Sequence, residues 1–244
     1  MRVGKVSYLN AMPLFYSLRG FEIVEGHPSY LVKLLRSGEI DAGIVSSVEY
    51  FFNPQDYYVL PDISISSRGK VCSVLLLSEK PIHEIKKVRI TPNSLTSRYL
   101  LFYLLKEVYR TTFEEVNEGE DALLIIGDEA MEIGERYPFS YDLGEEWFRA
   151  TGLPFVFALF LVRKESLSAE VMKLHRGLKR SLSLFFKDLR EGKIKKEYPI
   201  REYFETCIDY GFGSEYTRSL GRFFSFMEKE TGRSAPHSIS LFHP

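Results

Sequence analysis

The sequence contains little that would mark a metalloprotein, a redox protein or a nucleotide-binding protein. It has only two cysteines, Cys72 and Cys207, which form no CxxC or other ligand spacing, so no metal site is indicated. Cys72 lies in the apolar run 71–77 and is expected to be a small buried hydrophobic residue. GxGxxG, P-loop and HExxH motifs are all missing, and we expect neither a metal nor a cofactor. A chain of 244 residues can also bury enough apolar surface to be stable without disulfides.

Long apolar runs and an excess of charge of one sign are missing as well. The longest apolar stretch, 153–162, is about ten residues and too short to span a bilayer. The formal net charge is -1 with both signs scattered, which does not favour binding to nucleic acid or to anionic membranes. The opening residues, MRVGKVSYLN, lack the apolar centre of a signal peptide. We therefore expect a cytoplasmic protein that binds neither nucleic acid nor membrane.

Short apolar runs alternate with helical patterns along most of the chain. The first set of expected elements comprises strands at 2–8, 21–25 and 41–45 and helices at 11–18, 28–37 and from 47 onward. A second set comprises strands at 88–91, 122–126 and 140–143 and helices at 94–109, after 128 and around 147. Beyond a long strand at 155–163 the pattern is nearly all helical, at 168–189, about 200–210 and 214–231. Such β-α-β alternation favours parallel sheets flanked by helices.

The two β-α-β sets predict two lobes. The second set spans about 70 residues, which is too long for a loop insertion. Two apolar segments, 71–77 and 155–162, are expected to cross between the lobes, and a tight turn is expected at 67–69, between strand candidates at 62–66 and 71–77. The expected fold class is α/β, with a mostly parallel sheet in each lobe. The expected boundaries place 1–83 and 162–244 in the first lobe and 84–161 in the second.

Small polar side chains gather where the expected strands end. In open α/β sheets ligands bind beyond the carboxyl ends of the strands, and helix N-termini there favour carboxylates. Each such residue alone is more often a helix cap, but five such ends over two lobes favour a binding site. The set comprises Ser7, Tyr8, Asn10, Ser46, Ser47, Ser66, Arg68, Ser94, Thr96, Ser97, Gly127 and Asp128. Arg68 is of interest because arginine can pair with a carboxylate through two hydrogen bonds.

Six segments of the sequence, taken in order, carry a family resemblance. They are VSYLN at 6–10 with Pro13-Leu14, DAGIVSS at 41–47, ISSRGKV at 65–71 with Ser73-Val74, LIIGDEA at 124–130, YDLGEEW at 141–147 and TGLPFVFA at 151–158. Together they resemble the chorismate dehydratases of the futalosine route to menaquinone. Residues 93–98 keep the family's helix start only loosely, and Leu159-Phe160 stand where the family has a tryptophan. The resemblance implies a fold like that of type II periplasmic binding proteins, with two lobes around a cleft.

The resemblance also implies a reaction, the loss of water from chorismate to give 3-[(1-carboxyvinyl)oxy]benzoate. A proton leaves C3 and a hydroxyl leaves C4, and the ring becomes aromatic, so the protein's tasks are positioning and electrostatics. Asn10 is expected to contact the reacting ring, and Asp128 and Asp142 are acid/base candidates beside a substrate carboxylate. The expected substrate-binding set is Ser46, Ser47, Ser66 and Arg68 from the first lobe, Ser94, Thr96 and Ser97 from the second, and Ser7, Tyr8 and Gly127 as further contacts.

Other functions remain open at this point. A non-catalytic carboxylate-binding protein could use the same fold, although a solute receptor is expected to carry a signal peptide. The 1,4-dihydroxy-6-naphthoate synthase of the same pathway is similar in fold, but it depends on a histidine base, and none of the five histidines here lies in a catalytic motif. A structural or regulatory domain would not need polar groups at its strand ends. Both a monomer and a homodimer are compatible with the sequence.

Overall fold

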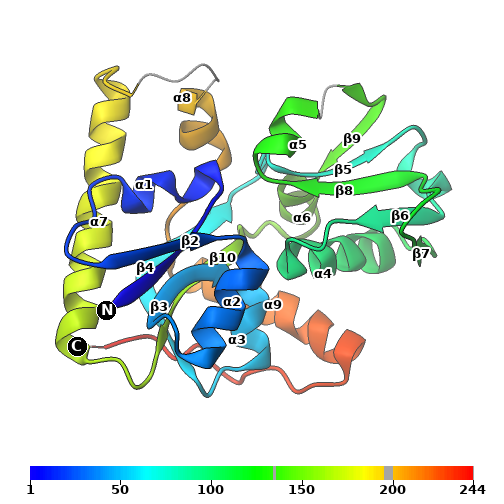
Figure 1. The fold of residues 1–244 in the computed structure, drawn as a ribbon. Helices are drawn as coiled ribbons and strands as arrows, with labels where there is room; N and C mark the ends of the chain where they lie inside the picture. The colour runs from blue at the N-terminus through cyan, green and yellow to red at the C-terminus, as the bar shows by residue number, and fades with distance from the viewer. Residues whose placement is uncertain (134–135, 195–199, 244) are drawn as a thin grey trace.

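The computed structural model describes residues 1–133, 136–194 and 200–243. Figure 1 shows these residues arranged as two lobes, with the N-terminal strands and the long helix α7 in one and the strands β5 to β9 in the other. Within the described ranges each lobe is built on a five-stranded sheet, which confirms the expected two-lobed α/β fold. No helix among these residues is both long enough and apolar enough to span a membrane.

The sheet of the first lobe combines N-terminal strands with one strand from later in the chain. Its strands, in spatial order, are β2 (Glu22–Gly26), β1 (Arg2–Val6), β3 (Ala42–Ser46), β10 (Phe155–Arg163) and β4 (Tyr57–Ser67). β1 pairs in parallel with β2 and β3, whereas β10 runs antiparallel to β3 and β4. The late strand β10 therefore returns the chain to the middle of the first sheet.

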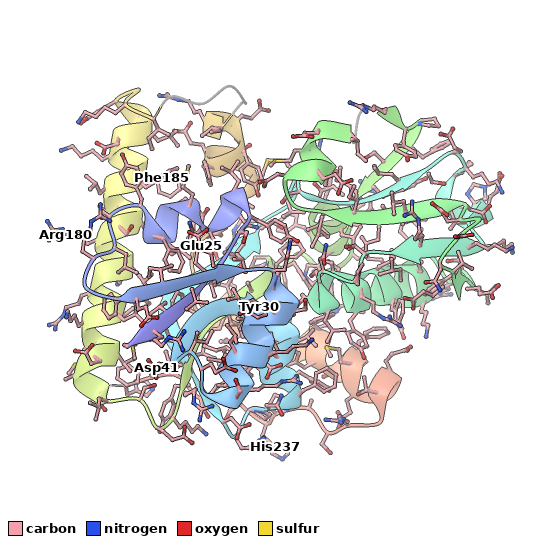
Figure 2. All side chains as sticks on the ribbon, in the orientation of Figure 1. Glu25, Tyr30, Asp41, Arg180, Phe185 and His237 are labelled. Atoms are coloured by element: carbon pink, nitrogen blue, oxygen red, sulfur yellow. A yellow bond between two sulfur atoms is a disulfide. The ribbon has the colours of Figure 1, made fainter. Side chains whose placement is uncertain are left out.

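Helices cover both faces of this sheet. They are η1 (Leu9–Ala11), α1 (Met12–Phe15), α2 (Pro28–Ser37), α3 (Ser47–Phe52), α7 (Ser168–Arg190), α8 (Ile200–Glu202), the π-helix η5 (Tyr203–Cys207) and α9 (Ser214–Thr231). α2 begins with Pro28 and ends at the left-handed Gly38, the two residues best suited to those positions. In Figure 2 Phe185 of α7 lies toward α1 in the interior while Arg180 of the same helix points outward, as its amphipathic pattern requires.

The second lobe repeats the arrangement at smaller size. Its strands, in spatial order, are β7 (Glu114–Glu115), β6 (Lys87–Ile90), β8 (Ala122–Ile126), β5 (Val74–Ser78) and β9 (Phe139–Asp142). Its helices are η2 (Ile82–Glu84), α4 (Leu95–Tyr103) with its π-helical continuation η3 (Leu104–Val108), α5 (Asp128–Ile133) and α6 (Leu143–Thr151). β6 is parallel to β7 and β8, whereas β5 is antiparallel to β8 and β9.

Three expectations about the sheets and the lobes need correction. The sheets are mixed rather than mostly parallel, because β5 and β10 enter their sheets directly from the other lobe and run against their neighbours. The strand candidates 62–66 and 71–77 do not pair with each other across the expected turn at 67–69, since β4 and β5 belong to different sheets. The chain crosses between the lobes at 68–73 and 152–154. β5 therefore belongs to the second lobe and β10 to the first. The expected boundaries, at 83/84 and 161/162, placed each of these strands in the other lobe.

Aromatic residues of both lobes share one core. Trp147 of α6 is fully buried, and its ring centroid lies 4.8 Å from that of Tyr103 in α4. It also lies 5.1 Å from Phe155 of β10 and 6.1 Å from Phe223 of α9. α9 thus packs beneath both lobes, as its place in Figure 1 shows. The lobes are joined along this side by packing as well as by the two crossing segments.

A disulfide joins Cys72 and Cys207, with 5.8 Å between their Cα atoms. The expectation that Cys72 is an isolated hydrophobic residue is therefore wrong. Cys72 is half-buried in the first crossing segment, and its positive φ of 62° turns it toward the buried Cys207 at the end of η5. The two residues are 135 positions apart, and only the folded chain brings them together.

Candidate active site

A pocket lies between the lobes, where β1, β3 and β8 end. This is the edge where α/β sheets bind ligands. Much of the wall is apolar and comes from both sheets and the first crossing, including Val6, Val45, Val71, Ile126 and Phe157. The polar wall residues are Tyr8, Asn10, Ser46, Ser73, Ser94, Ser97 and the backbone of Gly127.

Tyr8 follows β1, and its ring packs against Gly127 of the second lobe. Gly127 has a φ of +75°, and a Cβ placed on it would come within 2.8 Å of the Tyr8 ring, so only glycine fits there. The neighbouring Leu9 N–H donates to Oδ1 of Asp128 at 3.2 Å. Burial raises the pKa of the Tyr8 phenol, and the charges of Asp128 and Glu129 raise it further, so the phenol remains a hydrogen-bond donor at neutral pH.

Asn10 presents an acceptor that the protein leaves free. Its backbone carbonyl accepts a hydrogen bond of 2.7 Å from the buried Tyr210 hydroxyl. Its side-chain Oδ1 is buried and, among the described residues, has no hydrogen-bond partner. A buried carboxamide oxygen without a partner is costly. Because Asn10 also lines the pocket, a bound ligand is the natural partner for this oxygen.

Hydroxyl groups from the two lobes meet beside the pocket. The Oγ1 atom of Thr96 in α4 lies 2.5 Å from Oγ of Ser46 and 3.3 Å from Oγ of Ser47, at the end of β3. Ser94 caps α4 by accepting from the Ser97 N–H at 3.2 Å, and the two hydroxyls are 2.9 Å apart. Ser46, Ser94 and Ser97 line the pocket, whereas Thr96 and Ser47 are fully buried behind it.

Several expected substrate-binding residues lie away from the pocket wall. Ser7 is exposed, and Ser66 is buried with its Oγ 2.6 Å from that of Ser64. Arg68 is exposed and paired with Glu215 at 2.6 Å, with its guanidinium over the Tyr216 ring. An arginine neutralised in this way is not placed to bind a carboxylate between the lobes. The polar groups on the pocket wall are hydroxyls, the Asn10 carboxamide and the backbone of Gly127.

The two acid/base candidates both hold backbone N–H groups. Asp142 caps α6 by accepting from Gly144 and Glu145, and it accepts from Val71 and Cys72 of the first crossing segment at 2.7 to 3.1 Å. Burial raises the pKa of this carboxyl, and the N–H groups oppose that rise. Asp128 is exposed and accepts from Leu9. Neither aspartate lines the pocket.

Sequence reasoning missed Ser73, Tyr203 and Tyr210. Ser73 lines the pocket, and its segment is part of the family resemblance, so it could have been included. The two tyrosines bond to Ser73 and to the Asn10 carbonyl, respectively. They lie in the helical C-terminal part, where no pattern points to the pocket. No group of three or more histidine, cysteine or acidic side chains suited to a metal occurs within 1–133, 136–194 and 200–243.

Comparison with known proteins places this chain in a defined group. Residues 1–229 match the family model described as "Menaquinone biosynthesis". A chorismate dehydratase of Thermus thermophilus is 34% identical over 190 residues, which cover 67% of this chain and 70% of that protein. A chorismate dehydratase of Campylobacter jejuni is 30% identical over 239 residues, which cover 91% of this chain and 96% of that protein.

Solved structures share the fold at low sequence identity. A crystal structure of a protein from Archaeoglobus fulgidus has a TM-score of 0.74 at 15% identity, covering 95% of this chain and 98% of that chain. The periplasmic aliphatic sulphonate binding protein of Escherichia coli has a TM-score of 0.67 at 14% identity, covering 100% of this chain and 92% of that chain. These likenesses establish a periplasmic-binding-protein-like fold.

Proposed function

The chain belongs to the menaquinone biosynthesis family, and from this premise we propose that it is a chorismate dehydratase, a hydro-lyase that converts chorismate to 3-[(1-carboxyvinyl)oxy]benzoate. The observation that carries the proposal beyond family membership is the free Oδ1 of Asn10 at a pocket between the lobes. This pocket is mostly apolar with a few convergent polar groups, as a ring bearing carboxylates and a hydroxyl requires.

The hydroxyl cluster suits the substrate carboxylates. Ser94 and Ser97 stand at the N-terminus of α4, and Ser46 faces them from the first lobe. Hydroxyl and helix N-terminal donors favour a carboxylate without requiring a full positive charge. Donors from both lobes hold the ring in one orientation, which is the positioning task that the elimination needs.

The carboxamide of Asn10 acts on the reacting ring in this proposal. Its Oδ1 can only accept a hydrogen bond, so it binds the ring hydroxyl and fixes the conformer in which the C3 proton and the C4 hydroxyl are aligned for elimination. Asp128 and Asp142 are both engaged with backbone N–H groups outside the pocket wall. Their placement supports a carboxylate of the substrate itself as the acceptor of the C3 proton, which then passes to the departing C4 hydroxyl so that it leaves as water.

The alternatives are less well supported by the geometry. A histidine base is needed by the naphthoate synthase, and of the described residues no histidine lines the pocket. His27 lies beside Tyr8, with ring centroids 6.2 Å apart, but is not part of the wall. A non-catalytic binding protein would bind chorismate and release it unchanged, so direct assay separates it from an enzyme.

The test is incubation with chorismate followed by mass spectrometry. A product lighter by one water, with the ultraviolet spectrum of a benzoate, is expected from the wild type. Asn10→Ala is expected to lower turnover on the order of 10²-fold, because the ring hydroxyl loses its partner. Asn53→Ala is the matched control, since that carboxamide donates to Glu49 and does not line the pocket. Unchanged turnover in Asn10→Ala would disprove the site assignment, and unchanged chorismate with the wild type would disprove the activity.

A further inference from the structure

The backbone carbonyl of Asn10 needs a hydrogen-bond donor that its own helix does not supply. Asn10 lies in the 3₁₀-helix η1, and α1 begins only at Met12, with Ala11 as its N-cap. The first carbonyl that an α-helix bonds is that of its N-cap, so the Asn10 carbonyl comes before this ladder starts. Three residues after Asn10, where a 3₁₀ bond would find its donor, the chain has Pro13, which carries no N–H. The Asn10 carbonyl is therefore left for a partner from elsewhere in the fold.

Tyr210, which follows η5, supplies this donor. Its hydroxyl donates to the Asn10 carbonyl at 2.7 Å. The side chain is buried, and burial raises the pKa of its phenol, so the hydroxyl keeps its proton at neutral pH. The Tyr210 ring packs edge-on against Phe186 of α7, with centroids 6.0 Å apart. This packing restricts the direction in which the hydroxyl can point.

The backbone around Tyr210 is attached to strand β4 of the first lobe. Ser66 and Asp209 form an antiparallel bridge, in which both N–H to carbonyl distances are 2.8 Å. The Ser64 N–H donates to the Tyr210 carbonyl at 3.0 Å. Ile65, between these two residues of β4, lines the pocket. The Tyr210 hydroxyl therefore has a fixed place relative to the part of the sheet that forms the pocket wall.

We propose that Tyr210 is a positioning residue, which holds the backbone of Asn10 and so aims its carboxamide into the pocket. This inference rests on the proposed function, because it is there that Oδ1 of Asn10 binds the ring hydroxyl of the substrate. The neighbouring bond from the Leu9 N–H to Asp128 comes from the second lobe, so it orients η1 only while the lobes are closed. The bond from Tyr210 comes from the lobe of Asn10 itself, so it orients η1 whether the lobes are open or closed.

Tyr210→Phe removes the hydroxyl and keeps the ring. We expect kcat to fall on the order of 10-fold, because the carboxamide is no longer held against the ring hydroxyl, while KM changes by less than about twofold. Tyr50→Phe is the matched control, since Tyr50 is also buried and its hydroxyl also donates to a distant carbonyl, that of Ser238 at 3.4 Å, which does not line the pocket. Equal losses of kcat in the two variants, or an unchanged kcat in Tyr210→Phe, would overturn the proposal.

A double substitution tests whether Tyr210 acts through the Asn10 side chain. In an Asn10→Ala background, Tyr210→Phe is expected to cause little further loss of kcat, because no carboxamide is left to aim. Long incubation with detection by mass spectrometry measures the slow turnover of the Asn10→Ala protein. Losses that multiply in the double variant would show that Tyr210 acts on the fold in general, and would overturn the proposal.

Nuclear magnetic resonance of the wild type keeps the proposal testable even if Tyr210→Phe does not fold. The Tyr210 hydroxyl proton is expected to exchange slowly with solvent, because it is buried and bound to the Asn10 carbonyl. A hydroxyl proton that exchanges as fast as that of an exposed tyrosine would overturn the proposal. A wild type that protects this proton but leaves chorismate unchanged would refute the proposed activity alone.

Discussion

At the scale of single residues, the two aspartates show how one side-chain type serves different purposes. Asp142 is the last residue of β9 and Asp128 lies two positions beyond the end of β8, and both were candidates for proton transfer. In the folded chain Asp142 accepts hydrogen bonds from four backbone N–H groups, two of α6 and two of the first crossing segment. A carboxylate so fully occupied joins parts of the fold, whereas Asp128 makes one exposed contact between the lobes.

Replacing Asp142 by asparagine tests this distinction. The amide has one acceptor oxygen and turns a donor toward buried N–H groups, which costs about 2–4 kcal/mol of unfolding free energy. Melting temperature is therefore expected to fall by roughly 5–10 °C, whereas Asp128→Asn, at an exposed site, should shift it by less than about 2 °C. Thermal denaturation by circular dichroism measures both. An Asp142→Asn protein that melts like the wild type but has lost turnover would instead identify Asp142 as an acid or base.

At the scale of secondary-structure elements, the local sequence pattern predicted the bounds of several strands and helices, although the sheets are mixed. Strands 122–126 and 155–163 and helices 28–37 and 214–231 have the bounds that the sequence indicates, because caps and apolar periodicity act over a few residues. The assignment of β5 and β10 to sheets was not predictable in this way. Sheet membership depends on pairing between residues far apart, such as Ala158 with Ser46, and short apolar runs carry no information about their partner.

The short range of sequence patterns also explains which pocket residues were predicted and which were not. Asn10, Ser46, Ser94 and Ser97 lie at the pocket because strand ends and helix starts converge there whatever the sequence elsewhere. Tyr210 reaches the Asn10 carbonyl across 200 residues, and no local pattern marks such a contact. Arg68 was predicted to bind the substrate but does not line the pocket. It pairs instead with Glu215, from a helix that only the tertiary structure brings near.

The disulfide between the first crossing segment and η5 leads to a prediction about these elements. A bond that closes a loop of 135 residues restricts the unfolded chain and is worth about 2–4 kcal/mol. Reduction, or the paired substitution Cys72→Ala with Cys207→Ala, should lower the melting temperature by roughly 5–15 °C. The doubly substituted protein is its own control, because a reductant should not affect it further. Equal melting temperatures with and without reductant in the wild type would show that the bond contributes nothing.

At the scale of the whole molecule, the lobes are joined on one side and touch on the other. On the joined side α9 and Trp147 form a shared aromatic core, with Trp147 packed against Phe155 and Phe223. On the pocket side, hydrogen bonds join the lobes from Leu9 to Asp128 and from Ser46 and Ser47 to Thr96. An apolar core costs far more to separate than such hydrogen bonds. Substrate entry is therefore expected to separate the polar contacts and leave the core intact.

Thr96→Val tests this mode of opening. Valine keeps the shape of threonine but removes the Oγ1 atom that contacts Ser46, Ser47 and the Val48 N–H. With a loss of about 1 kcal/mol, the closed arrangement becomes about fivefold less populated, so KM should rise by about that factor with little change in kcat. Amide hydrogen exchange should also become faster at 46–48 and 94–97 without ligand. Thr111→Val is the control, because the Thr111 hydroxyl bonds to Leu105 within the second lobe. If the two variants behave alike, the hydroxyl contacts between the lobes do not hold the pocket closed.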